Sequence, residues 1–318
     1  MRKYKVFQAI TVHYLLSIIC TFFLISSLST NVHAVKLTYV KHLFDITSNF
    51  KQPSDIAVSD KGLIYVVDGV NNKIKVFNQE GKSLYAFGKK GSLNGQFNFP
   101  LGIHIDSVGK VYIADSGNHR VQVFTSSGDY ISQIKVPAHN NIPSDPTDIV
   151  VNESNARLFI ADNDNHHILA YNLSNGELIG KYGTPGMEKH EFRYPFLMSA
   201  DSNDYLYIVD VINTRIQVLN PDGKFVLIIG GWGVEKGKFF RPKGVTIDKN
   251  DLVYVSDSYM GVIQVFDADG SFHSVIGDRA GNSVKKFSTP VGIFIDKNNR
   301  LYVVEMFAEK IGVYSIED

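Results

Sequence analysis

A few side chains in this sequence have types and positions suited to chemistry. Asp55 and Asp148 are carboxylates, and His104 lies between them in the chain. Carboxylate oxygens are ligands that Ca²⁺ prefers, and imidazole nitrogens bind Zn²⁺. If the fold brings these three side chains together, they predict a divalent-metal-dependent lyase or hydrolase. The spacing assigns no Ser–His–Asp order, phosphate-binding glycine loop or pair of glycosidase carboxylates.

His166 and His167 form a second pair that resembles metal chemistry, in the segment Asp162-Asn-Asp-Asn-His-His167. Adjacent side chains at the start of a strand point to opposite faces, so only one of them could join a metal site. His167 also stands where related segments have Arg120 and Arg215. We therefore expect this pair to be structural.

Several loops share the motif Asp-x-x-Asn-x-Arg, as in Asp68/Asn71/Lys73 and Asp115/Asn118/Arg120. Asn tolerates the left-handed backbone of a tight loop, and the basic residue can pair with an Asp. We interpret this repeated motif as architecture. Two loops depart from it with apolar residues, and Trp232 lies in a further loop, Gly230-Gly-Trp-Gly233. These departures predict a surface for a partner or ligand, or else side chains folded inward as a cap: Tyr259, Met260, Met306, Phe307 and Trp232.

Composition narrows the class of protein. The 318 residues are 44% apolar and 20% charged, with 32 basic and 32 acidic residues, so a folded chain is expected rather than a disordered one. The single cysteine, Cys20, lies in the N-terminal segment described next. Without that segment the chain has no cysteine, which excludes thiolate zinc sites, iron–sulfur clusters and a cysteine nucleophile.

Residues 1–34 are typical of an export signal. Arg2, Lys3 and Lys5 precede the apolar stretch from Val6 to Leu28, and Val32-His33-Ala34 resembles a cleavage site. Cleavage after Ala34 is expected, although the stretch is long enough for an uncleaved membrane anchor. Either outcome places the remaining residues outside the cytoplasm. Losing the three basic residues leaves 29 basic and 32 acidic residues, a charge of −3, which argues against nucleic acid as a partner.

The elements that must position these candidates come from an internal repeat. One apolar strand ending in Asp or Glu recurs six times, with its last residues 47 or 48 positions apart, and a proline begins each unit about 15 residues earlier. The strands end at Asp68, Asp115, Asp162, Asp210, Asp257 and Glu305, and the prolines are Pro53, Pro100, Pro146, Pro195, Pro242 and Pro290. Each unit contains short β-rich runs bounded by turn residues. Six four-stranded units predict an all-β, six-bladed β-propeller over residues 35–318.

The last unit ends one strand short. It contains only Val291–Ile295, Leu301–Glu305 and Ile311–Ile316. We expect Leu37–Val40, within the closing segment 35–48, to supply the outer strand of blade 6, because pairing the two chain ends removes exposed edges.

These units resemble NHL repeats, whose proteins are six-bladed propellers. The resemblance rests on Pro100-Leu-Gly-Ile103 and Pro290-Val-Gly-Ile293, on Tyr112 to Phe124, and on Phe87-Gly88 followed by Gly95 and Phe97. It implies several possible functions, because related propellers bind RNA or protein, act as extracellular sensors or are a zinc-dependent amidating lyase. The lyase relatives hold zinc through histidines directly after the prolines, and here no histidine stands there: Ser54, Leu101, Thr147, Phe196, Lys243 and Val291. Relatives resembling gluconolactonases and paraoxonases bind calcium through acidic and amide side chains, so Asp55, Asp148, His104 and Lys243 remain candidates for a central channel.

Charge also distinguishes one face of the expected propeller. The loops from each outer strand to the next inner strand sum to +7, and the loops between second and third strands sum to −4, so this face carries +3. Such a face is suited to an anionic partner, or is simply a solvated loop surface.

The sequence thus favours an exported, non-catalytic recognition or scaffold propeller. Its expected partner is a protein or another anionic macromolecule outside the cytoplasm, with no cofactor, and it contacts the membrane only if the N-terminal segment is kept as an anchor. The alternative is an amidating-lyase-like or lactonase-like enzyme that uses a divalent metal in the channel.

Overall fold

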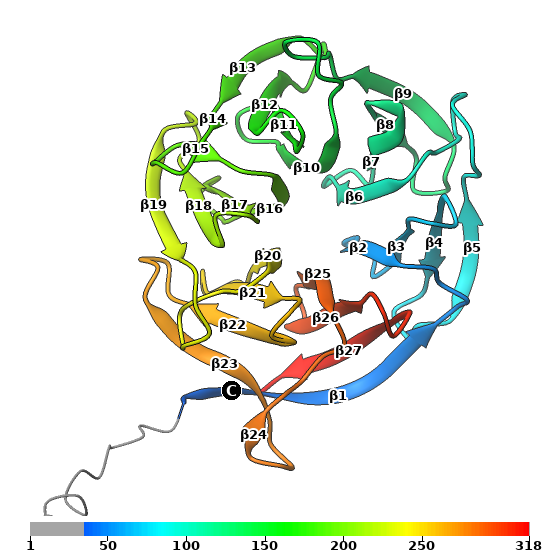
Figure 1. Cartoon of the computed structure of the whole chain (residues 1–318). Helices are drawn as coiled ribbons and strands as arrows, with labels where there is room; N and C mark the ends of the chain where they lie inside the picture. The colour runs from blue at the N-terminus through cyan, green and yellow to red at the C-terminus, as the bar shows by residue number, and fades with distance from the viewer. Residues whose placement is uncertain (1–34, 318) are drawn as a thin grey trace, which may run out of the picture. The chain divides into compact units, whose positions relative to one another are not determined.

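A computed structural model describes residues 35–317. They form six four-stranded antiparallel blades arranged around a central axis, and the first strand joins blades 5 and 6 into one continuous sheet (Figure 1). The expected export signal lies outside the described residues. No helix within residues 35–317 has the length and apolar character needed to cross a bilayer.

Each blade runs from an inner strand next to the axis to an outer strand at the rim. Blade 1 contains β2 (Pro53–Val58), β3 (Ile64–Asp68), β4 (Lys73–Phe77) and β5 (Ser83–Phe87). Blade 2 contains β6 (Pro100–Ile105), β7 (Val111–Asp115), β8 (Arg120–Phe124) and β9 (Tyr130–Lys135), with a 3₁₀ turn, η1 (Ser116–Asn118), between β7 and β8. Blade 3 contains β10 (Pro146–Asn152), β11 (Arg157–Asp162), β12 (His167–Asn172) and β13 (Leu178–Tyr182).

The remaining blades repeat this order. Blade 4 contains β16 (Pro195–Ala200), β17 (Leu206–Asp210), β18 (Arg215–Leu219) and β19 (Phe225–Gly230). Blade 5 contains β20 (Pro242–Ile247), β21 (Val253–Asp257), β22 (Val262–Phe266) and β23 (Phe272–Asp278). Blade 6 contains β25 (Pro290–Ile295), β26 (Arg300–Glu305) and β27 (Lys310–Ile316). Three two-residue strands lie in the connecting loops: β14 (Thr184–Pro185), β15 (Glu191–Phe192) and β24 (Ser283–Val284).

The N-terminal strand closes the ring, as the sequence predicts, but its pairing differs from the prediction. β1 (Leu37–Thr47) pairs antiparallel with β27 from Val40↔Ile316 to Thr47↔Lys310, which completes blade 6. Leu37–Val40, expected as the outer strand of blade 6, instead pairs in parallel with Val275–Asp278 of β23 in blade 5. β27 has seven residues, and the four residues Leu37–Val40 are too few to pair with all of them. The segment Val40–Thr47 therefore completes blade 6.

The hydrophobic core is divided among the seams between blades. Six clusters of buried side chains are present, and each combines strands of two neighbouring blades. At the seam of blades 1 and 2, for example, Tyr65 and Val67 pack with Ile113 and Phe124. Both faces of the middle strands are therefore covered, which explains why β3 and β7 are buried along their whole length.

The Phe-Gly and Gly-x-Phe motif fastens the loop between blades 1 and 2 to their seam. Phe97 is completely buried and packs 5.5 Å, between ring centroids, from Phe124. Gly88 has a φ of +88°, and a Cβ at this position would overlap the Phe97 ring. Only glycine therefore allows both the backbone turn and the close approach of the aromatic ring.

Two faces result from this architecture. We call the face formed by the outer-to-inner loops and the second-to-third-strand loops the loop face. The opposite face, formed by the hairpin turns after the inner strands and after the third strands, is the turn face. β14, β15 and β24 belong to the loop face, which is turned toward the viewer in Figure 1.

Candidate functional site

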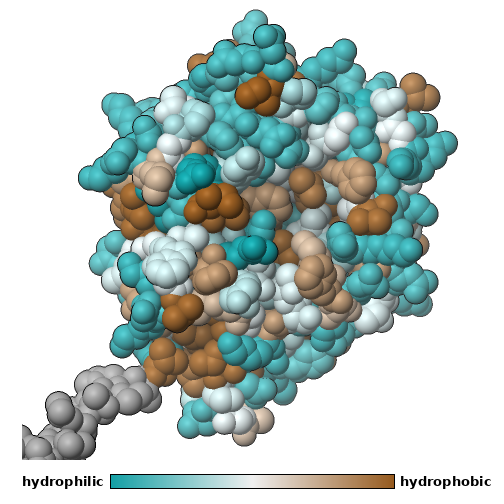
Figure 2. All heavy atoms as spheres, in the orientation of Figure 1, coloured by the Kyte–Doolittle hydropathy of each residue, from teal (hydrophilic) through white to brown (hydrophobic). Residues whose placement is uncertain are grey.

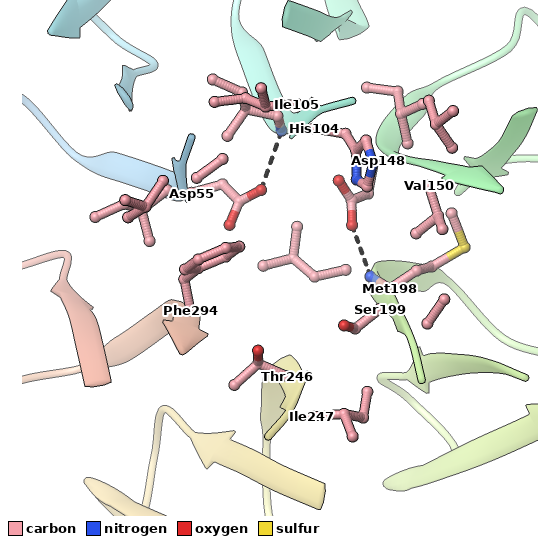
Figure 3. A pocket seen from close by; sticks show the side chains of 18 of the residues that line it. Asp55, His104, Ile105, Asp148, Val150, Met198, Ser199, Thr246, Ile247 and Phe294 are labelled. Atoms are coloured by element: carbon pink, nitrogen blue, oxygen red, sulfur yellow. Dashed lines mark hydrogen bonds between the residues drawn. The ribbon is translucent and has the colours of Figure 1, made fainter. Parts of the chain in front are cut away.

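A cavity of about 450 Å³ lies on the propeller axis and extends to the turn face. All six inner strands contribute to its wall. Asp55, Asp148 and Leu197, each the second residue after a repeat proline, line its deep end. Residues further along the strands form the middle of the wall, including His104, Val150, Ser199, Thr246 and Phe294 (Figure 3). The turns that follow the inner strands form its mouth, with Asp60, Ser107, Asp201 and Asp204.

Asp55 and Asp148 each reach across to the next blade. Asp55 Oδ2 accepts a hydrogen bond from the Ile103 N–H of blade 2 at 3.0 Å. Asp148 Oδ2 accepts one from the Met198 N–H of blade 4 at 2.7 Å (Figure 3). The preceding blade has glycine at the matching position, Gly292 and Gly102, where a Cβ would overlap Oδ1 of the aspartate. The pairing of each aspartate with a glycine in the preceding blade is therefore a steric fit as well as a choice of charge.

Both carboxyl groups have elevated pKa values. Asp55 is 6% exposed and Asp148 is 3% exposed. Burial raises the pKa of Asp55 from 3.8 to about 7, against the backbone hydrogen bonds that lower it. Burial and then the Asp55 charge raise the pKa of Asp148 well above its ordinary range. The two groups therefore interact electrostatically across the axis.

His104 and Lys243 have different positions relative to this pair. His104 lines the cavity, and burial lowers its pKa to about 4, so its imidazole is neutral at pH 7. Lys243 follows Pro242 directly and is not part of the cavity wall; its ammonium group lies 4.5 Å from the centre of the Phe196 ring. Burial and Arg241 lower the pKa of Lys243. The structure thus brings Asp55, Asp148 and His104 to one cavity and leaves Lys243 outside it.

The loop face carries most of the exposed apolar surface. Nineteen large apolar side chains are exposed within residues 35–317, and eleven of them lie in loops of this face. These are Val70, Leu93, Phe99, Ile142, Met187, Tyr194, Ile212, Trp232, Val234, Tyr259 and Phe307. Seven others lie on the outer strands β1, β5, β9, β13 and β19, and one, Val108, lies on the turn face. Figure 2 shows the brown apolar residues spread among teal ones over the loop face.

The five apolar candidates from the sequence divide into exposed and half-buried residues. Trp232, Tyr259 and Phe307 are 75%, 66% and 68% exposed. The Tyr259 ring stacks on Phe240 of the neighbouring loop, with 4.1 Å between centroids and 25° between planes. Met260 and Met306 are half-buried. The aromatic residues are therefore the accessible part of the predicted surface.

The repeated polar motif is structural, as expected. Asp115 is fully buried and accepts hydrogen bonds from the Asn98 N–H at 2.7 Å, Arg120 Nε at 2.7 Å and Gln122 Nε2 at 2.9 Å. Arg120 then donates to the carbonyls of Leu93 and Gln96, which fixes the preceding loop.

Blades 1 and 3 vary this motif. In blade 1 the basic partner of Asp68 is Lys75, at 2.7 Å, rather than the motif residue Lys73. Lys73 and Lys75 lie on the same side of β4, but Lys73 is exposed at the strand start whereas Lys75, two residues further along, is half-buried beside the carboxylate. In blade 3, His167 Nε2 lies 3.4 Å from Asp162 Oδ2 and so takes the arginine's place. These contacts support the structural interpretation of His167.

Comparisons with known proteins agree with this geometry. A family model for the NHL repeat matches residues 50–77 and 97–124. A second model, described as a 6-bladed beta-propeller, matches residues 250–318. The chain contains NHL repeats and folds as a six-bladed β-propeller. No curated protein matches the sequence of this NHL propeller.

Solved structures share the fold of this NHL propeller at low sequence identity. A virginiamycin B lyase from Staphylococcus aureus is 17% identical with a TM-score of 0.61, and the match covers 87% of this chain and 99% of the lyase. A gluconolactonase from Xanthomonas campestris is 11% identical with a TM-score of 0.66, and the match covers 89% of this chain and 96% of the lactonase. At these identities the likeness establishes the fold and carries no activity to the NHL propeller.

The NHL propeller's residues fit a metal centre poorly. No group of three or more His, Cys, Asp or Glu side chains within residues 35–317 is arranged to hold a metal ion. Asp55 and Asp148 each already direct one oxygen to a backbone N–H. Ca²⁺ takes six to eight oxygen ligands, more than these two carboxylates offer. The divalent-metal enzyme predicted as an alternative therefore lacks a recognisable ligand set in the described chain.

Sequence reasoning missed two parts of these surfaces. Phe99 and Tyr194 directly precede repeat prolines and are 52% and 42% exposed on the loop face, with φ values of +50° and +60°. Aromatic residues rarely adopt such backbone angles, so nothing in the sequence marks them beyond their place before proline. The acidic mouth of the cavity, with Asp60, Asp201 and Asp204, was also missed, because these residues look like ordinary turn residues.

Proposed function

We propose that this NHL propeller is a recognition module whose loop face binds a protein partner that presents acidic residues around an apolar contact. The observation that carries this proposal is the asymmetry of the two faces, with eleven exposed large apolar side chains on one and a single one on the other. Exposed apolar residues gathered on one face are typical of interaction sites. The proposal includes export, which the N-terminal sequence predicts.

The strongest part of this surface is a set of four aromatic residues on neighbouring loops, Trp232, Phe240, Tyr259 and Phe307, which we call the aromatic patch. It extends from the loop between blades 4 and 5 to the second-to-third-strand loops of blades 5 and 6. Aromatic residues are enriched among the residues that contribute most to binding energy. The stacked Phe240 and Tyr259 rings are fixed against each other, so binding them costs little side-chain entropy.

Charge favours an acidic partner. The acidic residues that begin the second-to-third-strand loops are buried and engaged with internal partners, so they contribute little to the outer surface. Exposed basic residues surround the apolar ones, and around the aromatic patch they include Lys236, Lys238, Arg241 and Lys286. Basic residues at the rim of an interface accelerate association with an acidic partner and make it salt-dependent.

The test is site-specific crosslinking followed by measured affinity. A photoreactive phenylalanine replaces Trp232, Tyr259 or, as a control on the outer strand β19, Val226, in the full chain expressed in its own cells. One protein crosslinked from positions 232 and 259 and absent at 226 would be the partner. Trp232→Ala should weaken its binding about tenfold or more, whereas Val226→Ala should not. Equal crosslinking at all three positions, or unchanged affinity of the Trp232 variant, would reject the proposal.

A further inference from the structure

We infer that the axial cavity binds a linear aliphatic amine, with its ammonium group held between the carboxylates of Asp55 and Asp148. This site lies at the turn face and is separate from the protein-binding surface proposed for the loop face. The inference rests on the charge of the wall, on a buried oxygen without a partner, and on the size and apolar character of the space.

The wall carries acidic residues at two depths. Asp55 and Asp148 lie at the deep end, and Asp60, Asp106, Asp201 and Asp204 lie at or near the mouth. No lysine or arginine is among the described residues that line the cavity. The only other titratable side chain of the wall is His104, which is neutral at pH 7. The acidic residues of the mouth attract a cation, and a cation at the deep end favours the charged forms of Asp55 and Asp148, whose pKa values are raised without it. The cavity therefore favours a cation whose binding releases protons from this pair.

An unpaired oxygen marks the position of the cationic group. Asp148 is only 3% exposed. Its Oδ1 nevertheless accepts no hydrogen bond within the described chain. The Asp148 side chain points to the axis in Figure 3, and Asp55 approaches from blade 1. A buried polar atom without a partner costs about 1 to 3 kcal/mol. Oδ1 lies against Gly102, so a rotation of the Asp148 carboxyl group is needed to turn it to the cavity. An ammonium group provides three N–H donors, and after this rotation it supplies the missing hydrogen bond and a counter-charge for the two carboxyl groups.

The space between the two acidic levels suits an aliphatic chain. Ile105, Val150, Ile247 and Phe294 line it, together with the hydroxyls of Ser199 and Thr246 (Figure 3). Asp55 and Asp60 are five residues apart, which is roughly 16 Å along an extended strand. The volume of about 450 Å³ is that of a small-molecule pocket and is large for a bare ion. A hydrated divalent cation would leave this apolar wall unused.

Calorimetric titration of the full chain with 1,5-diaminopentane at pH 8 tests the inference. We expect one saturable site, and 1,5-pentanediol, which keeps the chain length without charge, should not bind. Asp148→Asn keeps an acceptor for the Met198 N–H but removes the charge, and should weaken binding about tenfold or more. Asp222→Asn, on an exposed turn of blade 4, is the matched control and should bind like the parent.

The ligand has two natural sources, a free polyamine or the side chain of a lysine in a peptide. Titration with Nα-acetyl-lysine amide, which keeps the side-chain ammonium group, distinguishes them. Tighter binding of this compound than of the diamine points to a peptide. Binding of the diol as tightly as the diamine, binding of Ca²⁺ in place of any amine, or an unchanged affinity of the Asp148 variant with intact thermal unfolding would each overturn the inference.

Discussion

At the scale of single residues, the axial carboxyl pair makes the stability of the ring depend on pH. The pKa of Asp55 in the folded protein, about 7, lies above its ordinary value of 3.8. Between these values the folded state keeps a proton that the unfolded chain releases, so the free energy of unfolding falls as the pH rises through this interval. Each unit by which folding raises a pKa corresponds to about 1.4 kcal/mol in the free energy of unfolding. The carboxyl pair therefore lowers the free energy of unfolding at neutral pH, and its role in the protein is not to stabilise the fold.

Replacing Asp55 with Asn tests this dependence. The amide oxygen still accepts the Ile103 N–H but carries no charge, so Asp55→Asn should melt a few degrees above the parent at pH 8 and close to it at pH 4. Thermal unfolding followed by circular dichroism between these pH values measures the difference. Asp222→Asn, which is exposed, should show the parent's pH profile. A variant whose melting temperature tracks the parent at every pH would contradict the assigned sign.

The motif residue Asp115 should matter for stability rather than binding. Asp115→Ala leaves the buried Arg120 guanidinium and the Asn98 N–H without their acceptor, and we expect a loss of about 3 to 5 kcal/mol in the free energy of unfolding. Urea unfolding measures this loss. Asp222→Ala at the surface serves as the comparison and should change stability by less than about 0.5 kcal/mol. A similar small change in both variants would show that the motif does not fix the loop.

Some residue roles could be predicted from the sequence and others could not. The repeat aligns His167 with Arg120, and this alignment alone identified it as a structural residue. It also placed Asp55 and Asp148 near the channel, because their positions are glycine in three other blades. It could not show that each carboxylate bonds to the next blade, because that contact depends on how the two blades pack at their seam. Nor could it show that Lys75 replaces Lys73 within blade 1, because the repeat aligns Lys73 with Arg120.

At the scale of elements, β1 joins the first and last parts of the chain. Its C-terminal part is the outer strand of blade 6 and its N-terminal part extends the sheet of blade 5. The recurring prolines and Asp-ended strands predicted the inner strands to within one or two residues, since four similar turns mark each unit. The parallel pairing with β23 had no signal, because short apolar segments such as Leu37–Val40 fit either sheet.

Two residues of β1 that differ in burial provide a test of this closure. Ile46 is 1% exposed and packs with Phe50 and Ile311, whereas Leu43 is 38% exposed. Ile46→Ala should lower the free energy of unfolding by about 2 to 4 kcal/mol, and Leu43→Ala by much less. Deleting residues 35–48 should destabilise the ring further, by removing both pairings. Equal melting temperatures for the deletion and the parent would show that β1 is dispensable.

At the scale of the whole molecule, the propeller separates two surfaces of different chemistry. The loop face is apolar and basic, and the turn face opens to an acid-lined cavity. The inner strands between them are about six residues long, which is roughly 20 Å. The length of the repeat predicted the ring but not the different chemistry of its two faces. That difference depends on which side chains the seams leave exposed.

The separation predicts that the two surfaces bind independently. The seams between the described blades are closely packed apolar clusters, so we expect a ligand in the cavity to have little effect on the loop face. Saturation with 1,5-diaminopentane should therefore change the affinity for the crosslinked partner by less than about twofold, or about 0.4 kcal/mol. Reciprocally, Trp232→Ala should leave the diamine titration unchanged, and Asp148→Asn should leave partner affinity unchanged. A tenfold effect in either direction would show that the ring transmits a signal between its faces, and the seam between blades 4 and 5, which underlies Trp232, would be the first place to search for it.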